Sequence, residues 1–590
     1  MKTIACIRAG LLLGLTTWLS PTRAEGTPAL ALWRGTDFRG GAQGHFGANL
    51  CGREGVNYVY AQPTGAAATM TAVFDLPEHR RRPLYLYLEA MDDDAPAPCH
   101  IEVRLNQHVV WAGPSGFPNA QWRWHRYLLP TGAAHPGTNA LTILNQEPRG
   151  SLGMPPWFMV ARAAVATAGY QPPAAVVPTL QVRLPARLRP LPEPLPPGHT
   201  EPGFKYRGTK GWGWTPAQYL AEIPVLASLN MNFLMNCYSS MFTDPTPGRW
   251  KNEWWKPLPE TKKAAYTPVF QACREHGLIF CFALHPQLGS PRPLDPTRPA
   301  DVDALYQNYA WAQSQGVRWF SVSLDDVSWS RHGPAEGGAE HAHLVNTILG
   351  RLRQQDPQAQ MIFCPGPYWG DGTAPTARPY LAALGQELDP GVYVFWTGDG
   401  VVTPRITRRA AESYRRIVRH RLFLWDNYPV NDANPTLHLG PVRGRERDLG
   451  EVIDGYMSNP MATQNEINRI PLATCADYAY NPLGYDPARS IGQALLRQAS
   501  SGAERRVLRD LVQAYPGFLV TGGGTGTNPQ RQRFADSLAG GHSDAARATL
   551  RRLRNLATRM ARAFPQRFEA TQQTLADDIT WMEQQLPPPR

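Results

Sequence analysis

Two adjacent aspartates, Asp325 and Asp326, follow an apolar segment that is typical of a buried strand. The segment covers residues 317–328 and reads VRWFSVSLDDVS. A carboxylate loses much favourable solvation when it is buried unless it is paired or hydrogen-bonded, so a strand gains little structurally from two acids at its end. Paired carboxylates in an open pocket beyond a strand can instead transfer protons. Taken alone, the segment fits an Asp-rich turn better, because Asp is a common turn residue.

The chain around these aspartates alternates between strand-like and helix-like patterns. Short apolar runs predict strands at residues 204–209, 232–238, 278–284, 317–324, 361–364, 392–396, 422–425 and 455–457. Amphipathic stretches separate most of them, at residues 216–228, 261–276, 302–315, 340–353 and 408–419. Eight strands with intervening helices predict an α/β fold, a (β/α)8 TIM barrel over residues 204–485.

A barrel of this kind would bring polar and aromatic residues to one face. The residues in question follow the predicted strands: Asp325-Asp326, Tyr368-Trp369, Trp396-Thr397-Gly398, Asp426-Asn427 and Ser458-Asn459. The carboxyl ends of parallel barrel strands meet at the same face, so we expect these side chains to converge there. This convergence, more than any single motif, indicates an active site.

Several segments, in this order along the chain, resemble glycoside hydrolase family 84, which contains O-GlcNAcases and bacterial hyaluronidase-type β-N-acetylglucosaminidases. The matching phrases are FSVSLDDVS, CPGPYWG, LGQELDPGVYVFWTGDGVV, LFLWDNYPVNDANPTLHLGP, GYMSNPM and PLATCADYAYNP. The resemblance implies a retaining β-N-acetylglucosaminidase that removes terminal GlcNAc-type residues. It also implies substrate assistance, in which the acetamido oxygen of the sugar attacks the anomeric carbon and forms an oxazoline.

The resemblance further implies roles for single residues. Asp325 would hold and polarise the acetamido N–H, and Asp326 would be the general acid/base. By its position Cys364 would lie near the acetamido pocket. We interpret it as a small buried hydrophobe, not as a nucleophile. The residues expected to bind the sugar are Gly211 (through its backbone carbonyl), Tyr368, Trp396, Trp425, Asn427, Asp432 and Asn459.

Two segments depart from the family pattern. The Glu-Gly-Phe-Tyr-Gly-like turn of the family is KGWGWTP at residues 210–216, so that Lys210 replaces an acid. The Tyr-Ala-Pro-Lys segment of the family is CYSS at residues 237–240, and its Lys is missing near Ser239. Two hypotheses follow. Either Lys210 supplies the cation from a neighbouring strand, or the sugar or its substituent differs.

The regions outside the barrel have other patterns. Residues 1–24 read as a secretory signal peptide, which predicts a periplasmic or extracellular protein. Residues 25–170 predict a jelly-roll-like β-sandwich; RLNQHVVWAG and HPGTNALTILNQ resemble galactose-binding domains, and a sugar-binding and a purely structural role are both open. Residues 171–203 form a Pro-rich linker, and residues 486–590 predict an Arg-rich helical domain.

Composition restricts the partners. The 590 residues carry 59 basic and 48 acidic side chains, a net charge of +11, which can favour polyanionic glycans. No basic cluster interleaves with stacking aromatics, so nucleic acid is not expected. No apolar run of about 20 residues follows the signal, so no integral membrane segment is expected.

No CxxC motif is present and no metal or organic cofactor is implied. Cys51 and Cys99 are candidates for a disulfide in an oxidising compartment.

Three functions therefore stay open. The first is a β-N-acetylhexosaminidase acting on glycans or glycoconjugates. The second is a related hydrolase with altered specificity, either hyaluronidase-like or acting on another 2-acetamido sugar. The third is a catalytically silent glycan-binding protein. Binding without turnover would not require both Asp325 and Asp326, and their presence together with Tyr368 and Asn427 favours an enzyme.

Overall fold

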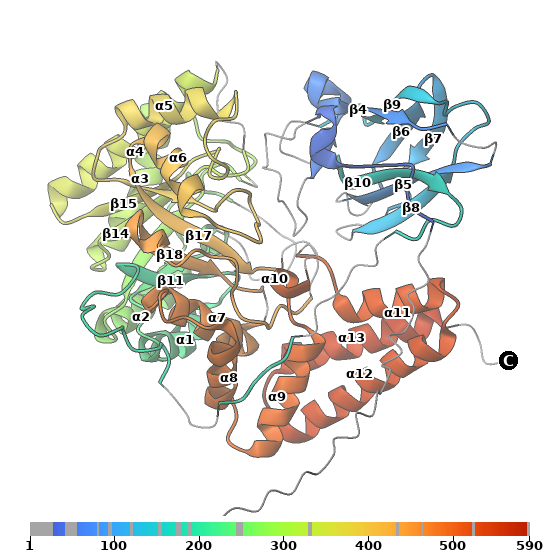
Figure 1. Ribbon diagram of the computed structural model, residues 1–590. Helices are drawn as coiled ribbons and strands as arrows, with labels where there is room; N and C mark the ends of the chain where they lie inside the picture. The colour runs from blue at the N-terminus through green and yellow to red at the C-terminus, as the bar shows by residue number, and fades with distance from the viewer. Residues whose placement is uncertain are drawn as a thin grey trace, which may run out of the picture.

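The computed structural model describes most of the chain and shows antiparallel sheets, a barrel and a set of helices in that order (Figure 1). The described residues are 27–41, 56–78, 82–92, 97–117, 122–150, 156–172, 180–185, 190–242, 252–288, 290–327, 333–431, 436–462, 464–521 and 525–586.

The first part is a sandwich of two five-stranded antiparallel sheets, as predicted. One sheet contains β1 (Ala31–Arg34), β10 (Trp157–Thr167), β5 (Leu84–Asp92), β8 (Arg123–Leu128) and, paired with β10, β3 (Asn57–Tyr60). The other contains β2 (Arg39–Gly40), β4 (Thr69–Leu76), β9 (Gly137–Asn145), β6 (His100–Leu105) and β7 (His108–Pro114). Burial alternates along β9, and Leu141 and Ile143 pack in one core with Leu86 and Leu88 of the opposite sheet.

The second part is a closed barrel of eight parallel strands, each hydrogen-bonded to the next in sequence, which confirms the (β/α)8 prediction. The strands are β11 (Tyr206–Gly211), β12 (Phe233–Asn236), β13 (Ile279–Leu284), β14 (Trp319–Ser323), β15 (Gln360–Cys364), β16 (Tyr393–Trp396), β17 (Arg421–Pro429) and β18 (Ile453–Asn459). The helices that follow them are α1 (Pro216–Ser228), α2 (Glu260–Glu275), α3 (Pro299–Ser314), α4 (Pro334–Gln355), α5 (Ala377–Glu387), α6 (Arg408–Val418) and α7 (Asn465–Tyr480). Every strand predicted from the sequence overlaps its counterpart.

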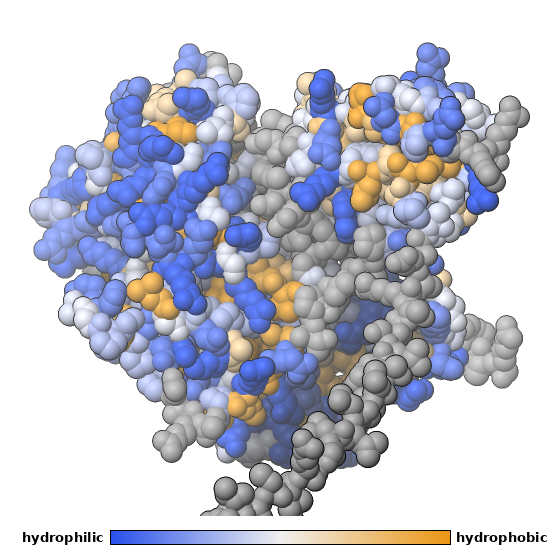
Figure 2. All heavy atoms as spheres, in the orientation of Figure 1, coloured by the Kyte–Doolittle hydropathy of each residue, from blue (hydrophilic) through white to orange (hydrophobic). Residues whose placement is uncertain are grey.

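Local sequence explains where these elements begin. Thr215 caps α1 in a reciprocal capping box with Gln218, and Pro216 occupies the first helical turn, where its missing N–H costs nothing. All four residues of β12 are buried, as expected for a strand covered on both faces. The face of the barrel helices seen in Figure 2 is mostly hydrophilic, so their apolar sides face the strands.

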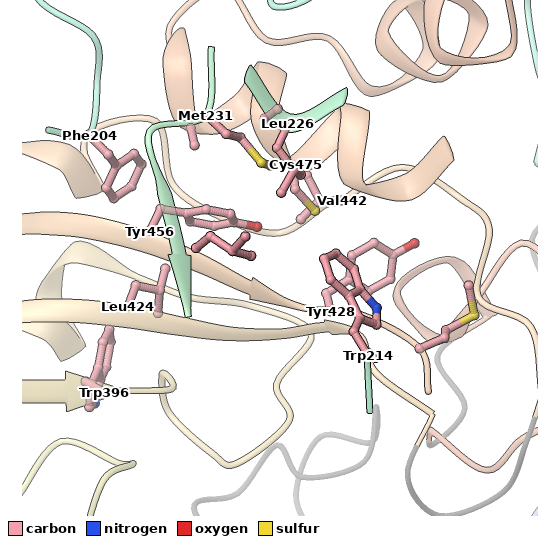
Figure 3. Close-up of a cluster of buried hydrophobic side chains, with 14 of the residues drawn as sticks. Phe204, Trp214, Leu226, Met231, Trp396, Leu424, Tyr428, Val442, Tyr456 and Cys475 are labelled. Carbon is pink, nitrogen blue, oxygen red and sulfur yellow. The ribbon is translucent and has the colours of Figure 1, made fainter. Parts of the chain in front are cut away.

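Side chains of the barrel strands alternate between two hydrophobic layers. The outer layer lies between strands and helices and contains Leu424, Tyr456 and Cys475 (Figure 3). The inner layer fills the barrel and continues into buried side chains of the sandwich, and its first level is aromatic: the ring centroids of Tyr206 and Trp319 lie 4.7 Å apart. These rings pack at the amino-terminal end of the barrel interior.

The segment between sandwich and barrel packs against the helices that follow the barrel. Leu180, Val182 and Leu191 are buried in the outer layer, and no helix or strand occurs in the described part of residues 171–203. The backbone N–H of Glu193 donates to a carboxylate oxygen of Asp477 on α7 at 2.5 Å. The described parts of the Pro-rich linker are therefore packed against the barrel and the helices that follow it.

The last part is helical, as predicted, and consists of α8 (Pro487–Gln498), α9 (Gly502–Ala514), α10 (Phe518–Thr521), α11 (Pro529–Ala539), α12 (Ser543–Ala563) and α13 (Glu569–Gln585). Among the described residues, no helix has both the length and the apolarity needed to cross a membrane. Cys99 is buried in the sandwich, whereas Cys51 lies outside the described residues, so their pairing stays a prediction.

Candidate active site

Strand β14 directs Asp325 into the barrel. Trp319 packs in the inner layer, whereas Phe320, Val322 and Leu324 pack in the outer layer, so Asp325 falls on the inner side of the same alternation. Regular alternation would turn Asp326 towards the helices. Its φ of 57° breaks the extended backbone instead, and Asp326 is exposed at the carboxyl end of the barrel. The sharp turn thus brings both carboxylates to one face.

Asp325 is almost completely buried, with 5% of its surface exposed. The phenol of Tyr238, which follows β12, donates to Oδ2 of Asp325 at 2.8 Å. Oδ1 accepts no hydrogen bond within the described residues. The Cys364 thiol lies beside the carboxylate, and its pKa is raised by burial first and then by the charges of Asp325 and Asp326. One oxygen of the carboxylate is therefore anchored and the other is available to a ligand.

His285, directly after β13, holds the backbone of the same turn. The backbone amides of Gln287 and Leu288 donate to its Nδ1 at 3.3 and 3.0 Å, so the ring proton resides on Nε2. Nε2 in turn donates to the backbone carbonyl of Asp325 at 2.8 Å. Burial lowers the pKa of His285, which keeps the ring neutral and preserves this arrangement at neutral pH.

Tyr368, in the loop after β15, contacts the second carboxylate. Its phenol donates to Oδ1 of Asp326 at 2.8 Å, and its own carbonyl accepts from the backbone N–H of Thr397 after β16 at 2.9 Å. Burial, followed by the charges of Asp326 and Asp325, raises the pKa of Tyr368 well above its usual value. The phenol therefore remains a hydrogen-bond donor at neutral pH.

Three predicted binding residues close the opposite side of the barrel mouth. Asn459 at the end of β18 donates from Nδ2 to Oδ1 of Asn427 on β17 at 2.8 Å, and Asn427 donates to the carbonyl of Val401 at 2.7 Å. The Trp425 ring is 4% exposed, and its centroid lies 6.2 Å from that of Tyr238. Within the described residues, Nε1 of Trp425 and Oδ1 of Asn459 have no hydrogen-bond partner although both are buried. These atoms can pair with a polar ligand.

Lys210 adds a cation to this group. Its side chain points inward from β11 and is 2% exposed. Its Nζ lies 4.3 Å from the ring centroid of Trp212, 4.2 Å from that of Trp425 and 5.2 Å from that of Tyr238. The structure thus places Lys210 next to the residues around Asp325.

Two predicted binding residues face away from the barrel mouth. Trp396 belongs to the outer layer (Figure 3). Its Nε1 donates to the carbonyl of Gly370 at 2.8 Å, and its ring packs on Tyr414 of α6. Only one of two neighbouring strand residues can face inward, and here it is Phe395. Trp396 therefore does not wall the pocket, contrary to prediction.

The Gly211 prediction fails for the same reason. Lys210 occupies the inward position, and Gly211 lies under helix α1, where its carbonyl accepts a hydrogen bond from the Tyr219 phenol at 2.9 Å. A Cβ at Gly211 would lie 2.2 Å from that phenol oxygen, which explains why glycine is required there. The carbonyl is occupied by the protein itself.

Other predicted positions give mixed results. Asp432 and the side chain of Ser239 lie outside the described residues. Asp426, beside Asn427, turns to the outer layer and binds Arg445 through both carboxylate oxygens, at 2.5 and 2.8 Å. Its role is thus structural.

Within the described ranges, no three His, Cys, Asp or Glu side chains are grouped so that they could hold a metal ion.

Sequence reasoning missed Tyr238 and His285. His285 immediately follows the strand predicted over residues 278–284 and Tyr238 is the last residue of the one predicted over 232–238, so both lie at strand ends, the signal that identified Asp325. Applying that criterion to every strand, and not only to the segments that resemble the family, would have found both.

Comparisons with known proteins show the family and the fold of the barrel region. The family model described as beta-N-acetylglucosaminidase matches residues 211–513. Protein O-GlcNAcase of Rattus norvegicus and that of Mus musculus are each 29% identical to the chain over 216 residues. That match covers 36% of this chain and 23% of each relative, so the chain spans about a quarter of the length of these curated relatives.

Solved structures show the same fold. An O-GlcNAc hydrolase mutant from Thermobaculum terrenum superposes with a TM-score of 0.53 at 22% identity, over 65% of this chain and 83% of that one. The structure of CpGH84B gives a TM-score of 0.50 at 20% identity, over 75% of this chain and 69% of that one. The family model covers more than half of the chain and includes every described site residue from Trp212 to Asn459. The barrel region confirms the resemblance seen in the sequence, and the chain belongs to the beta-N-acetylglucosaminidase family of glycoside hydrolases.

Proposed function

We propose that this chain removes terminal β-linked GlcNAc-type residues from glycoconjugates by substrate-assisted hydrolysis with retention of configuration. The observation that supports the mechanism best is the asymmetry of Asp325: Oδ2 accepts from Tyr238, whereas the buried Oδ1 accepts nothing within the described residues. An acetamido N–H is a donor that would match this free oxygen. A buried acceptor without a hydrogen bond is energetically unfavourable, so binding of such a donor stabilises the complex.

The first step would use both aspartates. Asp325 accepts a hydrogen bond from the acetamido N–H, which makes the acetamido carbonyl oxygen a better nucleophile. That oxygen forms a bond to the anomeric carbon as the glycosidic C–O bond breaks, and Asp326 gives its proton to the leaving oxygen. The products of this step are the released alcohol and an oxazoline that is still protonated on nitrogen (an oxazolinium ion), whose N–H continues to donate to the Asp325 carboxylate. Asp326 suits a proton carrier because it is exposed at the mouth, where leaving group and water can reach it.

The second step would reverse these roles. Asp326, now ionised, removes a proton from water, and the water oxygen attacks the anomeric carbon as the oxazoline C–O bond breaks. Two displacements on opposite faces restore the original configuration. In both steps we assign Tyr368 to hydrogen-bonding the acetamido oxygen and the Asn427–Asn459 pair to holding the sugar. The Trp425 ring would contact the apolar C–H face of the sugar.

Chromogenic glycosides test this function directly. The purified full chain is assayed with 4-nitrophenyl β-glycosides of GlcNAc, GalNAc and glucose, and the anomer first formed from GlcNAc is followed by NMR. We expect turnover of the GlcNAc glycoside, release of the β-anomer and negligible turnover of the glucoside, which lacks the acetamido nucleophile. Equal cleavage of the glucoside, or release of the α-anomer, would exclude the mechanism. Glycan binding without turnover would favour a silent binding protein.

Export is a separate proposal. The signal-like residues 1–24 lie outside the described residues, and we propose that they direct the chain across a membrane and are then removed. Amino-terminal sequencing of the protein recovered from cells tests this. A mature amino terminus near residue 25 would agree, whereas an intact terminus in the cytoplasmic fraction would contradict it.

A further inference from the structure

Lys210 lacks the ion-pair partner that several other buried charged side chains of the described residues have. Asp426 binds Arg445, Glu222 binds Arg469, and Asp578 binds Arg531. Lys210 is just as deeply buried, at 2% exposure, yet no carboxylate lies within ion-pair distance of it in the described part of the chain. No hydrogen-bond acceptor is found for its ammonium among these residues either, so its N–H donors are available to a ligand.

Aromatic rings form the surroundings of this ammonium. Trp212 follows Lys210 on the same segment, while Trp425 and Tyr238 come from other strand ends, and all three ring centroids lie within 5.2 Å of Nζ. Ring faces attract a cation through their quadrupole, which keeps the ammonium charged and in place. They do not neutralise it, and they replace the hydrogen bonds to water only in part.

The ammonium also lies on the acetamido side of the site. Tyr238 contacts both groups: its ring faces Lys210, and its phenol donates to Asp325. Burial is the main cause of the lowered pKa of His285 and the charge of Lys210 adds to it; the same charge partly opposes the burial that raises the pKa of Cys364, the other neighbour of Asp325. A sugar bound with its acetamido group at Asp325 would therefore present one of its other substituents to Lys210.

We infer that Lys210 and its three aromatic neighbours form an anion-binding subsite, and that the substrate is a 2-acetamido sugar that carries a carboxylate. This inference rests on the proposed function, whose acetamido site it adjoins. A carboxylate both accepts hydrogen bonds from the ammonium and cancels its charge, whereas a hydroxyl does only the first. A ligand with a single negative charge also matches one ammonium better than a dianion does. A phosphate dianion would carry excess negative charge into a pocket that already holds Asp325 and Asp326.

Binding measurements test the subsite independently of turnover. The full chain is titrated with GlcNAc, with its 3-O-lactyl ether (N-acetylmuramic acid) and with its C6-oxidised form (2-acetamido-2-deoxyglucuronic acid). We expect at least one of the two carboxylated sugars to bind about tenfold or more tightly than GlcNAc, the size of one charge-assisted hydrogen bond. In Lys210→Met, which keeps the apolar stem, we expect that preference to disappear.

A matched control lies just before the start of the same strand. Lys205 is exposed and its Nζ lies 5.2 Å from the ring of Tyr206, at the opposite end of β11. Lys205→Met removes an equal charge outside the site and should keep the preference for the carboxylated sugar. Thermal unfolding gives a further readout: losing an unpaired buried ammonium should leave the melting temperature of Lys210→Met equal to or above that of the wild type. A lower melting temperature together with an unchanged preference would show that Lys210 is structural.

The outcomes separate this inference from the proposed function. If the wild type cleaves the neutral GlcNAc glycoside but Lys210→Met weakens GlcNAc and both carboxylated sugars equally, the carboxylate inference is wrong and Lys210 binds a group that the sugars share. If no glycoside is cleaved but a carboxylated sugar binds through Lys210, the proposed hydrolysis is wrong and the subsite stands. Equal or weaker binding of both carboxylated sugars by the wild type would overturn the inference outright.

Discussion

The Tyr238 phenol donates a 2.8 Å hydrogen bond to Oδ2 of Asp325 and leaves Oδ1 without a hydrogen-bond partner among the described residues, with Nε2 of His285 3.6 Å away. This relationship gives the two oxygens of one buried carboxylate different tasks. Oδ2 is fixed by the protein, so rotation of the carboxylate is restricted, and Oδ1 is directed at the space where a ligand donor would bind. Burial keeps the pKa of Tyr238 well above its usual value, so the phenol stays protonated and continues to donate.

Tyr238→Phe should therefore lower activity without unfolding the protein. A hydrogen bond to a charged group contributes roughly 1.5–3 kcal/mol, which corresponds to a loss of about 10- to 100-fold in kcat/KM on the GlcNAc glycoside. Tyr485→Phe is the matched control, because the Tyr485 phenol is also buried and donates to the Val442 carbonyl at 2.7 Å, but belongs to the outer layer. We expect that variant to lose stability and keep its activity; equal losses in both variants would contradict an active-site role for Tyr238.

Asp326→Asn should show the signature of a lost proton donor. We expect kcat on a GlcNAc glycoside with a poor leaving group to fall by about 10²- to 10⁴-fold, the usual contribution of general acid catalysis. A 2,4-dinitrophenyl glycoside needs little protonation when it leaves, so its first step should be much less affected. Pre-steady-state release of the phenol measures this step. Asp325→Asn is the comparison, since loss of acetamido polarisation should slow both substrates alike.

Acid should destabilise the protein through buried histidines. Burial lowers the pKa values of His341 and His438 to about 4 from 6.5, so between these values the unfolded chain binds protons that the folded chain does not. Stability is therefore complete above pH 6.5 and falls as the pH drops towards 4, by about 2 kcal/mol per histidine at pH 5. Urea unfolding at pH 7 and pH 5 measures this loss. The loss of stability between pH 7 and pH 5 should be smaller in His438→Gln by about the contribution of one histidine. It should be unchanged in a variant of the exposed His542.

Breaking the Asp426–Arg445 pair should cost stability and not substrate recognition. Arg445→Met leaves Asp426 buried without its cation, which typically costs about 3–5 kcal/mol. Arg445→Met combined with Asp426→Leu removes both charges and should recover much of that loss. The half-exposed pair of Arg421 and Asp454, 3.7 Å apart, is the control, and Arg421→Met should cost less than about 1 kcal/mol. Chemical denaturation of the wild type, Arg445→Met, the double variant and Arg421→Met tests this order of stabilities.

Much of the fold could be read from the chain because it depends on local patterns. Apolar runs of strand length, separated by amphipathic segments, predicted all eight barrel strands, and α1 begins and ends where its cap and apolar spacing indicate. The position of Asp325 and Asp326 at a strand end was equally visible. These features are properties of neighbouring residues, so no knowledge of distant contacts was needed.

The direction of single side chains could not be read in the same way. Phe395 and Trp396 are both aromatic and adjacent, and only the barrel decides that Phe395 faces inward and Trp396 packs on α6. Asp326 joins Asp325 at the barrel mouth because its backbone turns at a φ of 57°, a conformation that no pattern in LDDVS specifies.

The sequence by itself determined the barrel, the paired acids at the end of its fourth strand and the family to which they belong. Tertiary structure decided which partners those acids have. Tyr238 and His285 reach Asp325 from two other strands, and Lys210 lies among three rings from separate strand ends with no ion-pair partner in the described part of the chain. Closing the barrel sets these distances, because it brings together residues that are far apart along the chain, and the chemistry of the site depends on those distances.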